Sequence, residues 1–181
     1  MGNNIDKVRL HGVRTCGDNY KLLGSLLASL KEYFSSFKAI CENFYLDLNE
    51  FEQIFSGNRT AFEIWDQEKN GLIDVFELFS GLVIFANGNL ENKTRFLFEI
   101  FDINEANHLS TIDIEFMIYS CLNSSFKILG IKEPVNEMEI TSFVEQHFPP
   151  NSEIKISSLI KFTTNSPQII DFLKIITLQK E

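Results

Sequence analysis

The chain has 181 residues, a net charge of -9 and 44% hydrophobic residues, among them 18 Phe. This apolar content is enough for a substantial core in one domain or two small lobes, which excludes wholesale disorder. The acidic balance argues against a nucleic-acid binder, because phosphate neutralisation needs a basic face, and it suits a cation or a basic partner instead.

The amino-terminal residues 1–19 are polar, and we expect them to form a solvated tail. They hold no secretory signal, and no later stretch has the ~20 apolar residues of a membrane span, so we expect a soluble cytoplasmic protein. Asp6 stands where the acylation pattern has Ser or Thr, so we do not expect myristoylation of Gly2. The cysteines form no C-x-x-C pattern, which indicates neither a disulfide framework nor a zinc site: Cys16, Cys41 and Cys121.

Helical periodicity runs along almost the whole chain. Apolar residues at three- and four-residue steps predict helices from Lys21 onward, over residues 92–101 and over residues 111–122. Ser166 followed by Pro167 predicts a last helix that begins at the proline. Clusters of turn formers separate these segments, so we expect an all-α fold in which any strands are very short.

The segment from Asp66 to Glu77 reads DQEKNGLIDVFE and crowds four carboxylates into twelve residues. A calcium ion takes six to eight oxygen ligands, which a twelve-residue loop supplies from positions 1, 3, 5, 7, 9 and 12. Gly71 stands at position 6, where the chain must turn sharply. The alternative is an acidic surface loop with a helix cap, but the pattern favours Ca²⁺, with Mg²⁺ as a second candidate. The predicted ligands are Asp66, Glu68, Asn70, the carbonyl of Leu72, Asp74 and Glu77.

Thirty-six residues later, the segment DINEANHLSTID repeats this pattern in weaker form. Ala106 removes the ligand at position 5, and Asn107 replaces the glycine but can still adopt the left-handed conformation. Asp113 at position 12 is too short to reach a cation easily with both oxygens, which favours magnesium or no metal. The candidate ligands of this second loop are Asp102, Asn104, the carbonyl of His108, Ser110 and Asp113.

Two further segments look like loops that have lost their ligands, although each could be an ordinary connector. Residues 39–50 keep Leu46 at position 8, and residues 149–160 keep Ile156 there. Loops of this type pair through their position-8 residues, so we predict that Leu46 lies beside Ile73 and that Leu109 lies beside Ile156.

These loops and the run ELFSGLVIFANGNLENKTRFLFEIFD between them resemble the EF-hand superfamily, within it the four-unit regulatory proteins of the neuronal calcium sensor, calcineurin B and calaxin type. The resemblance implies two lobes, each a pair of helix-loop-helix units. The expected divisions are a tail (1–19), an amino-terminal pair (20–88), a carboxy-terminal pair (89–165) and a final helix (166–181). The short helix before Asp66 argues against a large calcium-driven opening of the amino-terminal lobe.

The resemblance implies a calcium-responsive regulatory protein that receives an amphipathic helix of a partner in an apolar groove. The final helix could fill that groove or dock on the partner. The alternative is a calcium-independent light chain or docking subunit of a cytoskeletal or ciliary assembly. We do not expect an enzyme, because the histidines fall in no catalytic pattern: His11, His108 and His147.

Overall fold

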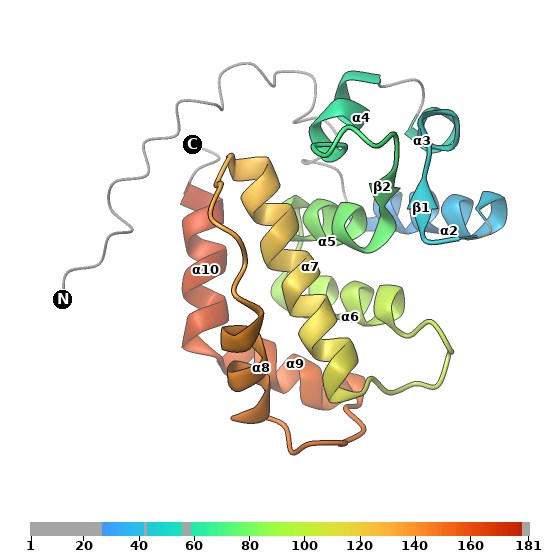
Figure 1. Ribbon diagram of the computed structural model, residues 1–181. Helices are drawn as coiled ribbons and strands as arrows, with labels where there is room; N and C mark the ends of the chain where they lie inside the picture. The colour runs from blue at the N-terminus through green and yellow to red at the C-terminus, as the bar shows by residue number, and fades with distance from the viewer. Residues whose placement is uncertain (1–26, 42, 56–58, 179–181) are drawn as a thin grey trace.

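The computed structural model describes residues 27–41, 43–55 and 59–178, and within them the chain is mostly helical (Figure 1). The all-α prediction is therefore confirmed. The predicted tail, Gly2 and the start of the first helix lie outside the described residues. The helices of the first half are α2 (Leu27–Ile40), α3 (Leu48–Phe55), α4 (Arg59–Trp65) and α5 (Val75–Phe85). Those of the second half are α6 (Leu90–Phe101), α7 (Thr111–Leu129), α8 (Glu137–Glu145), α9 (Ile156–Asn165) and α10 (Pro167–Leu178). None of these helices, which are the ones in the described ranges, is both long and apolar enough to cross a membrane.

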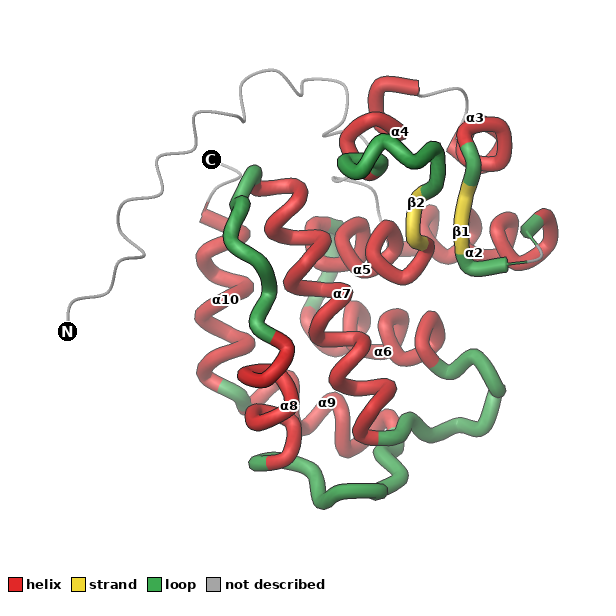
Figure 2. Tube along the Cα trace, viewed as in Figure 1, coloured by secondary structure: helices red, strands yellow, loops and turns green. Residues whose placement is uncertain are grey.

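Two short strands join the first two loops. β1 (Tyr45–Leu46) and β2 (Ile73–Asp74) are antiparallel, and Leu46 lies opposite Ile73, as predicted. Figure 2 shows this pair in yellow beside α3 and α4. Both paired aliphatic side chains are buried, so the pairing places the Asp66 loop on the core and fixes its register.

The second pair of loops also meets, but in a different register from the one predicted. Leu109 exchanges two backbone hydrogen bonds with Ile154, with N to O distances of 2.9 and 2.7 Å. The predicted partner, Ile156, is instead the first residue of α9. The prediction was wrong because it began the fourth loop at Pro149, two residues too late, in a segment without ligands to fix the count.

Helix α7 is longer than the apolar pattern predicted. It begins with a capping box between Ser110 and Asp113 and continues past residue 122 to Gly130, whose φ of 68° ends it in the left-handed conformation. The hydroxyls of Ser124 and Ser125 donate to the carbonyl of Cys121, at 3.1 and 2.7 Å, so these polar side chains are satisfied inside the helix. The added turns bring the end of α7 close to α4 and α5 (Figure 1).

Helix α5 lies at the centre of the fold, and every one of its residues except Glu77 is buried. It packs against α7, so one core extends through both halves of the chain. Gly81 permits the close approach, because a Cβ there would lie 2.5 Å from the Trp65 ring and 3.1 Å from Ser124 Cβ. The boundary predicted at residue 88 therefore falls between helices that share a core.

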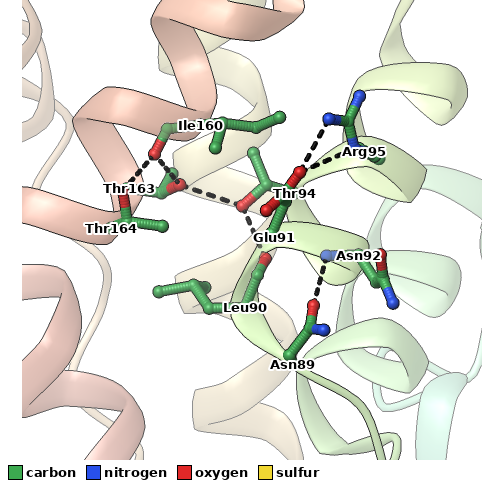
Figure 3. Close-up of polar contacts among 9 residues, drawn as sticks. All are labelled: Asn89, Leu90, Glu91, Asn92, Thr94, Arg95, Ile160, Thr163 and Thr164. Carbon is green, nitrogen blue, oxygen red and sulfur yellow. Dashed lines mark hydrogen bonds and ion pairs between the residues drawn. The ribbon is translucent and has the colours of Figure 1, made fainter.

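Helices α6 and α9 meet around a buried pair of hydroxyls (Figure 3). Thr94 Oγ1 and Thr163 Oγ1 lie 2.9 Å apart, and Thr94 also donates to the carbonyl of Leu90 at 2.9 Å. Asn89 caps α6 by accepting from the N–H of Asn92. These contacts join the entering helix of the third unit to the exiting helix of the fourth.

Candidate metal site and apolar cavity

The backbone of the Asp66 loop is wrapped around the carboxylate of Asp66. Its two oxygens accept the N–H groups of Asn70 and Gly71, each at 3.0 Å. Lys69 and Gly71 have φ of 55° and 81°, which turn the chain twice within three residues. Asn70 in turn accepts the N–H of Leu72 at 2.9 Å. The loop therefore holds the oxygens of positions 1 and 5 in place by local hydrogen bonds.

The Asp102 loop has the same backbone form despite its weaker sequence. Asp102 accepts the N–H groups of Ala106 and Asn107 at 2.9 and 3.0 Å. Glu105 and Asn107 have φ of 52° and 60°, matching positions 4 and 6 of the first loop. The expectation that Asn107 adopts the left-handed conformation is confirmed. Two loops 36 residues apart thus share the hydrogen bonds of their first aspartate and the positive φ values of positions 4 and 6.

Two predicted ligands at the end of the Asp66 loop have other partners. Asp74 is the N-cap of α5 and accepts the N–H of Glu77 at 2.9 Å, and burial raises the pKa of its carboxyl above the usual range. The carboxylate of Glu77 accepts hydrogen bonds from Asn123 Nδ2 and Lys127 Nζ on α7. Among the described residues, no three carboxylate, imidazole or thiol groups form a cluster that could hold a metal ion.

Of the other predicted ligands of the Asp66 loop, Glu68, Asn70 and Leu72 are exposed, and Asp66 is partly buried. Glu68 lies on the surface, with Oε2 3.4 Å from Asn70 Nδ2. Leu72, whose carbonyl is the predicted ligand, has a side chain that is 46% exposed. Asp66, Asn70 and Asp74 all present oxygen atoms within one loop, which is the donor chemistry of a hard divalent cation. The chemistry of these donors therefore fits the predicted ion, although Asp74 caps α5 and Glu77 is hydrogen-bonded by α7.

In the Asp102 loop, several predicted ligand residues make contacts of other kinds. Asp113 accepts from both the N–H and the hydroxyl of Ser110, each at 2.8 Å, so its carboxylate serves the helix cap. His108 Nδ1 lies 3.1 Å from the carbonyl of Ala106, and its Nε2 lies 3.9 Å from Glu153. Asn104 is exposed. Ser110 and Asp113 contact each other, but the described residues hold no cluster of three carboxylate, imidazole or thiol groups that could bind a metal ion here.

An apolar cavity of about 570 Å³ lies within the second half of the molecule. Helices α6 to α9 form its walls, and α10 closes one side through Ile169, Phe172 and Leu173. The final helix thus packs on this groove, the first of the two arrangements considered from the sequence. Other residues that line the cavity are Leu97, Ile118, Cys121, Leu122, Val135 and Phe143.

Cys121 offers a test of how well this cavity excludes water. Burial raises the pKa of its thiol from 9.0 to about 12. Because the thiolate is the reactive form, the raised pKa lowers the fraction of reactive thiolate at pH 8. We expect iodoacetamide to alkylate Cys121 at least about a hundredfold more slowly in the native protein than in urea, as measured by mass spectrometry of its peptide. Equal rates would show that the cavity opens freely.

The same shift gives a direction to the pH dependence of stability. The folded protein keeps the Cys121 proton above pH 9.0, where the unfolded chain releases it. The contribution of the protonated Cys121 thiol to the free energy of unfolding is therefore complete below pH 9. It is lost as the pH rises toward 12.

Sequence reasoning missed two residues of the candidate site, Asn123 and Lys127. Both lie on the part of α7 beyond residue 122, where the predicted helix ended. The basic side chain of Lys127 in an acidic protein was the available signal for a carboxylate partner. Nothing in the sequence placed Lys127 beside the Asp66 loop.

Comparison with known proteins gives partial similarities. No protein-family model matches the chain. It is 29% identical over 87 residues to a recoverin family protein of Dictyostelium discoideum. The aligned region covers 47% of this chain and 39% of that protein. It is 33% identical over 74 residues to human calaxin, covering 41% and 34%, and 29% identical over 83 residues to chicken guanylyl cyclase-activating protein 1, covering 40% and 42%.

The matched part is thus less than half of each curated relative. These homologues are all EF-hand proteins of the neuronal calcium sensor type. With its paired helix-loop-helix units and the common form of its two central loops, the chain is similar, over the matched part, to EF-hand proteins of the neuronal calcium sensor type.

Proposed function

We propose that this protein binds calcium in the Asp66 loop and regulates a protein partner. The observation that carries the proposal is the form of that loop, in which Asp66 and Asn70 are fixed by hydrogen bonds to backbone N–H groups. A loop ordered in this way loses little conformational entropy on binding, which favours affinity. The similarity to calcium sensors supports the same role.

The proposed ligands come from the loop and from the first turn of α5. Four carboxylates in twelve residues repel one another, and a divalent cation between them removes that repulsion. A bound cation would also tie α4, which enters the loop, to α5, which leaves it. The ligands are the side chains of Asp66, Glu68, Asn70, Asp74 and Glu77 and the carbonyl of Leu72.

For the Asp102 loop we propose a weaker cation site, suited to magnesium, or a purely structural role. Its backbone has the same form, but position 5 is Ala106 and the carboxylate of Asp113 is used by the cap at Ser110. With fewer oxygens available, calcium loses most of the six to eight ligands it needs.

The proposed partner surface is the apolar cavity of the second half. An amphipathic helix of a cytoplasmic partner could place apolar side chains there, and α10 already lies along one side. The phenylalanine-rich, methionine-poor composition favours a dedicated partner, since flexible methionines are typical of surfaces that accept many.

Calcium titration of the purified protein tests the proposal. Trp65 directly precedes Asp66 and is buried between α5 and α7, so its fluorescence reports on the loop. We expect binding with a Kd of roughly 10⁻⁷ to 10⁻⁵ M, seen both by Trp65 emission and by calorimetry, that persists in millimolar magnesium. Absence of binding, or its loss in magnesium, would contradict a calcium sensor.

A second candidate is a constitutive light chain or docking subunit of a cytoskeletal or ciliary assembly. The contacts of Glu77 with α7 and of Asp113 with Ser110 favour it, because both carboxylates have roles without metal. Equal binding of an apolar dye such as ANS by metal-free and calcium-loaded protein would support this candidate. A clear increase with calcium would support the first.

A further inference from the structure

We propose that Lys127 and Asn123 set the calcium affinity of the Asp66 loop by holding the carboxylate of Glu77. This inference rests on the proposed function. Glu77 then has two alternative states. In the metal-free protein its carboxylate is bound by the two side chains of α7, and in the calcium-loaded protein it binds the cation in the loop. Lys127 is thus an internal competitor for the position-12 ligand.

The first support is an internal comparison of three loops that have a carboxylate at position 12. In the first loop, Glu50 folds back to accept the N–H of Asp47 at 2.9 Å. In the third, Asp113 does the same with Ser110 at 2.8 Å. Glu77 in the second loop reaches α7 instead, across 46 and 50 positions of sequence. Among the described residues, Glu50 also hydrogen-bonds the thiol of Cys41, just after α2, whereas Glu77 is held by two side chains from within α7.

The second support is the shielding of the ion pair. The side chains of Lys127 and Glu77 are 21% and 15% exposed, whereas those of Lys31 and Glu99 are 47% and 51% exposed. Water and salt screen a shielded pair less, so separating it costs more than separating a surface pair. Any cation that uses Glu77 must offset this cost, which lowers its measured affinity.

The third support is that the loop contacts the same end of α7 at further points. Gln67 Nε2 donates to the carbonyl of Lys127 at 3.4 Å. Trp65, Ser124 and Ile128 all approach the Gly81 position closely. Release of Glu77 would therefore change the packing between α7 and both helices that flank the loop. The same part of α7 also lines the apolar cavity through Leu122 and Phe126, which connects the loop to the proposed partner surface.

The test is the calcium affinity of Lys127→Met, measured by calorimetry and Trp65 fluorescence. Methionine has a similar length, so the helix packing is kept while the competing charge is removed. We expect about tenfold tighter binding than in the wild type. Lys161→Met is the matched control, since it removes the same charge at an exposed position of α9, and its affinity should stay within about twofold of the wild type.

The outcomes separate the two proposals. If the wild type binds calcium and Lys127→Met binds it no more tightly, this inference is overturned and the proposed function stands. A lack of calcium binding in the wild type and in both variants would overturn the proposed function and this inference with it.

A cross-linking measurement distinguishes direct competition from a general effect of charge. A water-soluble carbodiimide joins a lysine amine to a carboxylate in contact with it, and mass spectrometry identifies the joined peptides. We expect a cross-link between Lys127 and Glu77 in the metal-free protein that falls at least about fivefold in saturating calcium. A cross-link of equal abundance in both states would contradict the exchange of partners.

Discussion

Replacement of Glu77 by glutamine is expected to weaken calcium binding by about a hundredfold or more. The neutral amide offers one ligand oxygen in place of two and removes a negative charge from the loop. Calorimetry and the emission of Trp65 measure the loss. Glu63→Gln, on the exposed face of α4, makes the same chemical change without touching the loop and should bind calcium as the wild type does.

The same substitution should also destabilise the metal-free protein, because it leaves Lys127 shielded without its carboxylate. We expect the free energy of unfolding to fall by about 1–2 kcal/mol, less than for a fully buried pair. The double variant Glu77→Gln with Lys127→Met should recover this stability but not the calcium affinity. Recovery of calcium affinity in the double variant would show that Glu77 is not a ligand.

The sequence predicted the form of the Asp66 loop because its determinants are local. Oxygen-bearing residues at fixed positions, Gly71 at the sharp turn and Ile73 at position 8 lie within twelve residues. The pairing of Leu46 with Ile73 followed from counting along that pattern, and the structure confirms it. A loop whose conformation depends on its own hydrogen bonds can be derived from its own residues.

The fourth loop shows where such counting fails. Without ligands, residues 149–160 offered no carboxylate pattern to set the register, and the predicted pairing at Ile156 was wrong by two residues. The observed partner Ile154 is 2% exposed, so burial of an aliphatic side chain rather than ligand spacing determines the pairing there.

The partners of Glu77 could not be predicted for a different reason. They depend on the last turns of α7, which lie beyond the predicted range 111–122 and in which Asn123, Ser124 and Ser125 have low helix propensity. Packing against α5 and hydrogen bonds to Cys121 keep these residues helical. Tertiary contacts thus override local propensity at the place where α7 reaches the Asp66 loop.

Replacement of Phe79 by alanine is expected to lower the free energy of unfolding by about 3–5 kcal/mol. Phe79 is fully buried in α5, and its ring centroid lies 5.0 Å from that of Phe34, 6.3 Å from Phe37 and 6.2 Å from Phe55. Its loss leaves a cavity between three helices that cannot easily collapse. Phe116→Ala is the control: its ring is 39% exposed, so about 1–2 kcal/mol is expected.

Urea unfolding, followed by helical circular dichroism and by Trp65 fluorescence, measures both variants and also tests the shared core. Because α5 packs on α7, removal of Phe79 should shift the whole transition, and the two probes should stay coincident. Two lobes that folded independently would instead give two phases, with Trp65 reporting only the earlier one. Coincident curves would mean that the calcium loop, α7 and the apolar cavity belong to one cooperative unit, which the proposed exchange of Glu77 requires.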